Sequence, residues 1–74
     1  MEAIMLFKDL IKNIRMNCLI SQTELARWLK TDQTSISYYE MGKRQPSLKT
    51  LKRTIDIANE KGMDIKYTDI EDKE

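Results

Sequence analysis

The chain has 74 residues, of which 41% are hydrophobic and 34% are charged, a composition typical of one small folded domain. It contains no histidine, two glycines and one cysteine, so we expect no catalytic site, no cofactor, no metal site and no internal disulfide. The single thiol is typical of the cytoplasm, and we expect neither a signal peptide nor a membrane span.

The formal net charge of +1 hides an uneven distribution of charge along the chain. From Lys8 to Arg53 there are ten basic and four acidic residues, whereas from Thr54 to Glu74 there are three basic and seven acidic ones. Because a polyanion responds to the local field more than to the sum, a basic body with an acidic end remains compatible with DNA binding.

The apolar spacing predicts a first helix over about residues 3–16, which Asn17 is expected to close in a left-handed conformation. Ser21 is expected to cap a second helix, with Glu24 completing a capping box. The polar stretch 30–33 ends that helix.

The third helix is expected from about Gln33 to Glu40 or Met41, capped by Thr31 or Asp32 and stopped at Gly42. Pro46 excludes a helix through the next loop, and Ser47 is expected to cap a fourth helix. Its inward residues would be Leu48, Leu51, Ile55 and Ala58.

The tail alternates apolar and polar residues from Met63 to Ile70, which predicts a short strand. We therefore divide the chain into a domain over 1–62 and a tail over 63–74 that ends in a frayed acidic segment. The strand would pair two copies of the chain through Met63, Ile65 and Tyr67. A fifth short helix, or contact through the exposed side of the fourth helix, is the alternative.

Two short helices joined by a polar turn, with a helix on each side, form the layout of a helix-turn-helix. The segments "SQTELARWL" and "QTSISYYEMGKRQPS" resemble the Xre/Cro-type helix-turn-helix family of phage and bacterial repressors. The resemblance extends from about Phe7 to Ala58 and implies a compact all-α, four-helix (possibly five-helix), lambda-repressor-like fold. The chain departs from the family at Leu19 and Lys30, where relatives favour glycine or a small residue.

The resemblance places the third helix in the major groove of DNA. Its residues that the core does not need are the expected base readers: Gln33, Thr34, Ser37 and Tyr38. The expected phosphate contacts are Gln22, Lys43 and Arg44, with Arg27 and Lys30 as weaker candidates. The family pattern also implies a structural ion pair between Arg15 and Glu40.

The function that follows is a sequence-specific, homodimeric DNA-binding regulator of transcription, expected to act as a repressor on an inverted-repeat operator. The alternatives are an interaction protein, such as the antitoxin of a toxin–antitoxin pair, and a restriction–modification controller. Trp28 is expected to lie across the edge of the first helix or, alternatively, to be exposed for a protein partner.

Overall fold

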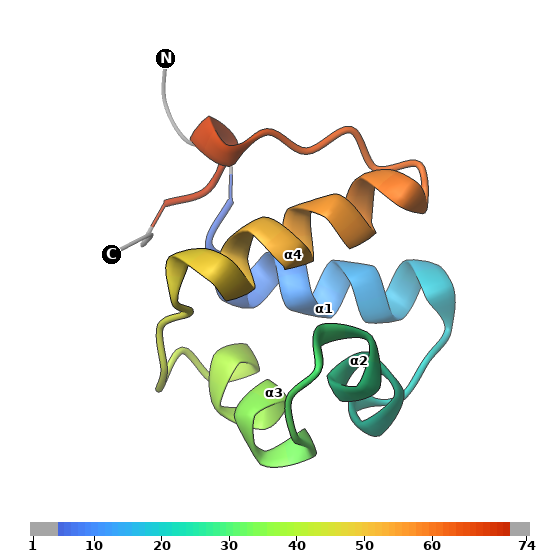
Figure 1. Cartoon of the computed structure of the whole chain (residues 1–74), viewed down its shortest axis with the longest axis vertical. Helices are drawn as coiled ribbons and strands as arrows, with labels where there is room; N and C mark the ends of the chain where they lie inside the picture. The colour runs from blue at the N-terminus through green and yellow to red at the C-terminus, as the bar shows by residue number, and fades with distance from the viewer. Residues whose placement is uncertain (1–4, 72–74) are drawn as a thin grey trace.

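Four α-helices and one 3-10 turn make up the computed structural model, which describes residues 5–71. The helices are α1 (Phe7–Cys18), α2 (Gln22–Leu29), α3 (Gln33–Glu40) and α4 (Leu48–Glu60), and the turn η1 spans Tyr67–Asp69. Helices α2 and α3 lie together at one end, with α1 and α4 above them (Figure 1). The expected all-α, four-helix, lambda-repressor-like fold is confirmed.

Three helices begin at the side-chain caps that the sequence predicts. The hydroxyl of Ser21 accepts a hydrogen bond from the backbone N–H of Glu24 at 3.1 Å. The carboxylate of Asp32 does the same for Ser35 at 2.8 Å, and Ser47 for Thr50 at 3.2 Å. Each cap satisfies a donor that the first helical turn leaves unpaired, which fixes where α2, α3 and α4 begin.

The core lies where the four helices meet. Leu10, Ile11 and Ile14 of α1, Leu25 of α2 and Ile36 of α3 are fully buried. The rings of Phe7 and Tyr39 meet edge to face, with centroids 5.2 Å apart, so α3 is held against the start of α1. On α4 the buried set differs from the prediction at two positions, since Leu48 is 55% exposed and Thr54 is fully buried.

Helices α1 and α2 both end at residues in the left-handed conformation. Leu19 has φ 57° and Lys30 has φ 58°, and the sequence prediction that Asn17 closes α1 is wrong because the helix continues to Cys18. These are the two positions where the related family favours glycine or a small residue. At both positions the Cβ atom makes the left-handed conformation sterically unfavourable, so the two turns are formed with some loss of stability.

The strand predicted for residues 63–70 does not form within the described range, where η1 and a single parallel bridge between Met5 and Ile70 are found instead. Asn59 binds both backbone groups of Ile65, donating to its carbonyl at 3.0 Å and accepting from its N–H. Ile65 and Ile70 are buried in the core. Two apolar positions of the alternation, Ile65 and Ile70, therefore pack the tail against the domain and do not belong to a strand.

The bridge brings the two ends of the described chain together, as the ribbon near the top of Figure 1 shows. The backbone N–H of Met5 donates to the carbonyl of Asp69, and that of Glu71 donates to the carbonyl of Met5 at 2.9 Å. The expected fraying of the acidic end falls largely on residues 72–74, outside the described residues.

We predict that Leu19→Gly raises the free energy of unfolding by about 0.5–1 kcal/mol, measured by urea denaturation. The left-handed conformation costs a non-glycine residue about 1–2 kcal/mol, part of which glycine offsets through its more flexible unfolded state. The Leu19 side chain is 91% exposed and so loses little packing. As the control, Met16→Gly inside α1 should lower stability by about 1 kcal/mol. A Leu19→Gly protein no more stable than the parent would contradict the steric argument.

Candidate nucleic-acid interface

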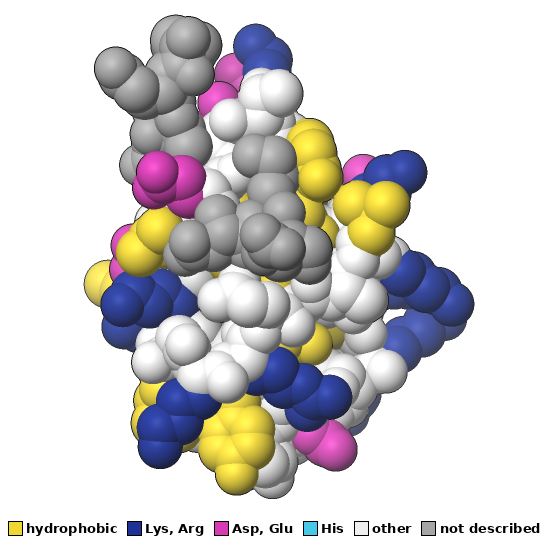
Figure 2. Space-filling view, turned by 90° about the vertical axis from the view of Figure 1, so that its left-hand side faces the viewer, with side chains coloured by type: hydrophobic (Ala, Val, Ile, Leu, Met, Phe, Trp, Pro, Cys, Tyr) yellow, Lys and Arg dark blue, Asp and Glu magenta, His cyan; other side chains and the backbone are white. Residues whose placement is uncertain are grey.

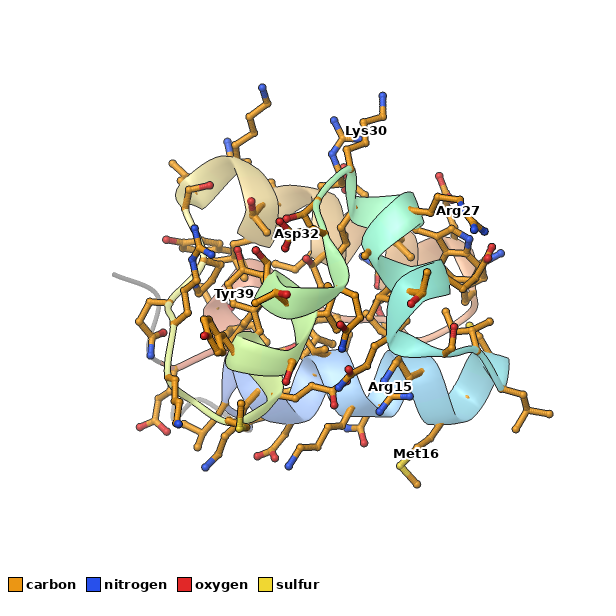
Figure 3. All side chains as sticks on the ribbon, turned by 90° about the horizontal axis from the view of Figure 1, so that it is seen from below. Arg15, Met16, Arg27, Lys30, Asp32 and Tyr39 are labelled. Carbon is orange, nitrogen blue, oxygen red and sulfur yellow. The ribbon has the colours of Figure 1, made fainter. Side chains whose placement is uncertain are left out.

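Helix α3 presents one face to the core and the other to solvent. Its buried residues are Ser35, Ile36, Tyr39 and Glu40. Among the four expected base readers, Gln33, Thr34 and Tyr38 are exposed and Ser37 is half-buried. Seen from below, α3 lies between α1 and α4, with α2 at its side (Figure 3). The helix is thus held mainly by α1 and α2, while its outer surface stays accessible.

The structure brings Arg15 of α1 and Glu40 of α3 together in a two-point ion pair. Arg15 Nε donates to Glu40 Oε2 at 2.6 Å, and Nη2 donates to Oε1 at 3.1 Å. A third donor, Nη1, reaches the carbonyl of Ile20 at 3.3 Å. The planar guanidinium therefore fixes both the distance and the angle between α1 and α3.

Glu40 keeps its charge although it is only 8% exposed. Burial opposes the charged form, but hydrogen bonds from Arg15 and Gln22, together with the positive charge of Arg15, outweigh burial and lower the pKa of Glu40. The same hydrogen bond raises the pKa of Arg15. Both partners are therefore ionised at neutral pH.

Gln22 and Gln33 are joined to this pair by side-chain hydrogen bonds. Gln22 Nε2 donates to Glu40 Oε1 at 3.0 Å, and Gln33 Nε2 donates to Gln22 Oε1. One predicted phosphate contact and one predicted base reader are thus linked in a single series, which we call the amide relay (Glu40, Gln22 and Gln33). It runs from the buried ion pair to the outer surface of α3.

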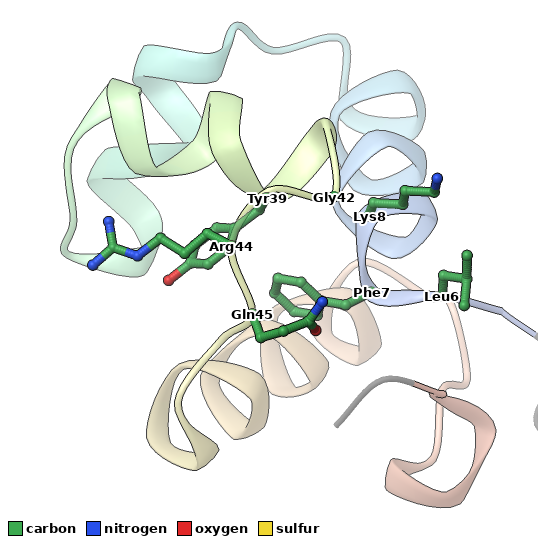
Figure 4. A pocket seen from close by; sticks show the side chains of 7 residues that line it. All are labelled: Leu6, Phe7, Lys8, Tyr39, Gly42, Arg44 and Gln45. Carbon is green, nitrogen blue, oxygen red and sulfur yellow. The ribbon is translucent and has the colours of Figure 1, made fainter. Parts of the chain in front are cut away.

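Arg44 is exposed in the loop after α3, and its side chain also bonds back to the start of that helix. Its Nη1 donates to the hydroxyl of Ser35 at 3.0 Å, and its positive charge helps to lower the pKa of Asp32, which is lowered mainly by the hydrogen bond from the Ser35 backbone. In Figure 4 the side chain extends away from Lys8 and Gln45, which line a hollow of about 110 Å³ beside it. Arg44 therefore fastens the loop to the start of α3.

The other predicted phosphate contacts differ in whether their side chains are already paired with a carboxylate of the domain. Arg27 is paired with Glu24 one turn earlier on α2. Lys43 is exposed in the loop after α3. Lys30 projects outward at the end of α2, beside α4 (Figure 3). Lys43 and Lys30 form no ion pair with a residue in the range 5–71.

Two further cations, which the sequence analysis did not select, lie beside Lys30. Lys30, Lys49 and Arg53 border one hollow of about 210 Å³, completed by Leu29 and Thr50. The i, i+4 spacing of Lys49 and Arg53 on α4 was a signal that they share a face, but only the fold places them next to the end of α2. Figure 2 shows basic side chains gathered over the lower half of one face, toward the end formed by α2 and α3.

The three residues expected to pair two copies of the chain do not share one face. Ile65 is buried, Met63 is half-buried, and Tyr67 is 41% exposed. Because the backbone of Ile65 is already bonded to Asn59, it has no free hydrogen-bonding groups for a partner strand at that residue.

Trp28 lies against the end of α4, so the expectation that it crosses the edge of α1 is wrong. Lys61 Nζ lies 4.8 Å from the centre of the Trp28 ring. The indole N–H donates to Glu24 at 3.0 Å. The Glu24 carboxylate is therefore turned toward Trp28 and away from the backbone N–H of Ser21, which it would have to bond to complete the predicted capping box. The half-buried indole joins α2 to α4 through a cation–π contact.

No group of three or more His, Cys, Asp or Glu side chains between residues 5 and 71 is arranged to hold a metal ion. None of the helices in that range is long and apolar enough to cross a membrane.

Comparison with known proteins places this geometry in a family. Residues 11–56 match the model of the helix-turn-helix family HTH_3. The match begins within α1 and ends within α4, so it contains the Arg15–Glu40 pair and the whole amide relay. No curated protein and no solved structure matches the chain.

We predict that Glu40→Gln lowers the free energy of unfolding at neutral pH by about 2 kcal/mol, because it leaves a partly buried Arg15 without its counter-charge. The folded pKa of Glu40 lies below its ordinary value of 4.5. Its stabilising effect is therefore complete above that ordinary value and is lost as the pH falls through the lowered folded pKa.

Urea denaturation of parent and variant from about pH 7 down to about pH 3 measures this effect. The difference between the two proteins should shrink toward the acid end. Glu60→Gln at an exposed position of α4 is the matched control and should show little difference anywhere. A parent–variant difference that stays constant with pH would contradict the assignment.

Proposed function

The chain belongs to the HTH_3 (Xre/Cro-type) helix-turn-helix family of non-enzymatic, DNA-binding domains, and from this premise we propose that it is a sequence-specific, homodimeric transcriptional repressor. The observation that carries the proposal is the outer face of α3. Three side chains able to hydrogen-bond with bases are exposed there, while the opposite face is buried. Such a helix can enter a major groove about 12 Å wide without disturbing the core.

The base readers are Gln33, Thr34, Ser37 and Tyr38. Gln33 and Thr34 occupy the first turn of α3, the end that reaches base edges in helix-turn-helix proteins. A glutamine can form two hydrogen bonds with adenine, and a threonine can offer its hydroxyl to a base or its methyl group to thymine. Tyr38 lies one turn later on the same side, where its phenol can reach a base or a phosphate.

The phosphate contacts lie on both sides of α3. Gln22 stands at the start of α2, where backbone N–H groups favour an anion, and Lys43 follows the end of α3. Lys30, together with Lys49 and Arg53, forms a second basic cluster beside the start of α3. Arg27 is a weaker contact because Glu24 competes for it, and we assign Arg44 to holding the loop in place.

A dimer is required by the amount of sequence that one helix can read. Each mismatched base pair changes the binding free energy by only about 1–3 kcal/mol, which is too little to select one site when a single copy reads about four base pairs. Two copies on half-sites about 34 Å apart would solve this. With the tail packed on its own domain, we favour contact through the exposed side of α4, where Leu48 is 55% exposed.

We place the protein-interaction role, as an antitoxin, second. Trp28, the aromatic side chain that would suit a protein partner, already contacts Lys61 and Glu24 within the domain. A restriction–modification controller would use the same DNA-reading surface, so it differs in genetic setting rather than in chemistry.

We predict that Gln33→Ala reduces specificity at one base position in each half-site and leaves the other positions unchanged, because direct base contacts act locally. The measurement is selection of bound duplexes from a pool randomised across the site. Preferences that remain the same at every position would show that Gln33 reads no base.

We predict that Lys43→Ala weakens binding to all sequences alike, because a phosphate contact carries no sequence information. If about four phosphates are neutralised in each copy, the slope of log binding constant against log salt is near −7 for the dimer and becomes less steep by about 2 in the variant, at roughly 0.9 per phosphate.

Lys66→Ala, which removes the same charge from the tail, is the matched control and should leave the slope unchanged. A Lys43→Ala protein with an altered base preference, or with the parent's salt slope, would refute the phosphate contact.

A further inference from the structure

We infer that two copies of the chain associate through the outer side of α4, with the two helices antiparallel and their charges complementary. The inference rests on the proposed function, which requires a dimer, and adds the surface, the register and the residues of the contact. Four charged side chains carry it, which we call the charged stripe: Lys49, Arg53, Asp56 and Glu60.

The charged stripe follows one face of α4 along nearly its whole length. Its members are spaced by four, three and four residues, which places them on one side of a helix. The buried residues of α4 lie on the opposite side: Leu51, Thr54, Ile55 and Ala58. The stripe therefore points away from the core, with two basic residues in its first half and two acidic residues in its second half.

Within one copy this order of charges is unfavourable for the helix. Lys49 and Arg53 are i, i+4 neighbours of like charge, as are Asp56 and Glu60, and such pairs destabilise a helix. The basic end lies at the N-terminus of α4 and the acidic end at its C-terminus, which is the reverse of what the helix dipole favours. None of the four forms an ion pair with a residue between 5 and 71. The stripe thus lacks its counter-charges in the described part of the domain.

A second copy supplies these counter-charges when its α4 runs antiparallel. With Arg53 set opposite the partner's Asp56, the antiparallel direction sets Lys49 opposite the partner's Glu60. Twofold symmetry repeats both pairs, because the same patch serves on each copy. The basic half of each helix then meets the acidic half of the other, which offsets both the like-charge spacing and the unfavourable dipole term.

The order of charges also selects this register over its neighbours. Sliding the helices by about one turn in one direction sets the two copies of Arg53 against each other. Sliding them in the other direction does the same for the two copies of Asp56. A parallel arrangement sets like charges against like charges along the whole stripe. Because like charges across an interface oppose association, a single antiparallel register satisfies the stripe.

The same twofold axis suits two copies of α3 that read one duplex. Helix α4 runs across the view in Figures 1 and 3, and in Figure 3 α3 faces the viewer. An axis along the line of sight of Figure 3 makes the two α4 helices antiparallel and leaves both α3 helices on the same side. An inverted repeat requires this arrangement. With Lys49 and Arg53 paired to carboxylates, Lys30 remains as the phosphate contact at the end of α2.

The contact is small, so we expect it to be weak without DNA. A helix of 13 residues is about 20 Å long, and a stable dimer usually buries more than about 1,200 Å². Lys52 and the half-buried Ile57 border the same hollow as the stripe, and in this register Lys52 lies opposite the partner's Ile57. Association should therefore need high protein concentration and low salt, until adjacent half-sites on DNA hold two copies together.

The test is a pair of charge-reversal variants, compared by sedimentation equilibrium without DNA. Asp56→Lys with Glu60→Lys makes the stripe basic throughout, and Lys49→Glu with Arg53→Glu makes it acidic throughout. At about 50 mM salt each variant alone should self-associate at least about tenfold more weakly than the parent, because every pair becomes repulsive. An equimolar mixture should regain the parent's affinity within about threefold, since the two stripes are then complementary along their full length.

Asp64→Lys with Glu71→Lys, at two exposed positions of the tail, is the matched control. It changes the net charge as much as the basic variant does but leaves α4 intact, so it should self-associate within about threefold of the parent. Thermal melting followed by circular dichroism establishes that all compared proteins are folded. Raising the salt to about 500 mM should weaken the parent and the mixture alike, because screening shortens the range of every pair.

The outcomes separate the inference from the proposed function. A parent that stays monomeric at low salt, reversed variants that associate as well as the parent, or a mixture no stronger than its components would each overturn the inference. If that parent still selects an inverted repeat from random duplexes, the proposed function stands and the dimer uses another surface. A parent that selects no sequence overturns the proposed function, even where the mixture of reversed variants associates and so supports the α4 contact.

Discussion

The fold depends on one buried carboxylate. Glu40 accepts hydrogen bonds from Arg15 of α1 and Gln22 of α2 while itself belonging to α3, so a single group joins three helices at fixed angles. A charge in that position is tolerated only when it is fully paired. In the described part of the chain, every buried side-chain nitrogen or oxygen has a hydrogen-bond partner. The arrangement favours geometric precision over stability, since an apolar cluster of similar volume could pack as well.

This precision matters because α2 and α3 have only eight residues each. Helices of that length are marginal in isolation and take their order from packing and caps. With the inner face of α3 buried and Glu40 at its C-terminal end paired, the outer face is placed rigidly without being used for stability. Gln33, Thr34 and Tyr38 are therefore exposed on that outer face. The buried ion pair thus fixes the position of the surface that remains exposed.

Much of the fold was predictable because its signals are local. Ser21, Asp32 and Ser47 cap their helices through side chains three residues from the bonded N–H, and apolar spacing identified the helices. Several of the misses are non-local. The alternation of residues 63–70 has the period of a strand, yet Asn59 and the core fix Ile65 and Ile70 differently. No pattern in the sequence brings Lys30 next to Lys49 and Arg53, or turns Arg44 back to Ser35. Leu19 was unexpected in a left-handed turn because its residue type disfavours it.

The central claim is that α3, held from behind, reads DNA sequence as one half of a dimer. Selection of bound duplexes from a random pool at moderate salt tests it most directly. The account predicts an inverted repeat whose half-sites lie about one helical turn apart, close to 34 Å. Binding without any enriched sequence, or no binding at all, would contradict it and would favour a protein partner for this domain.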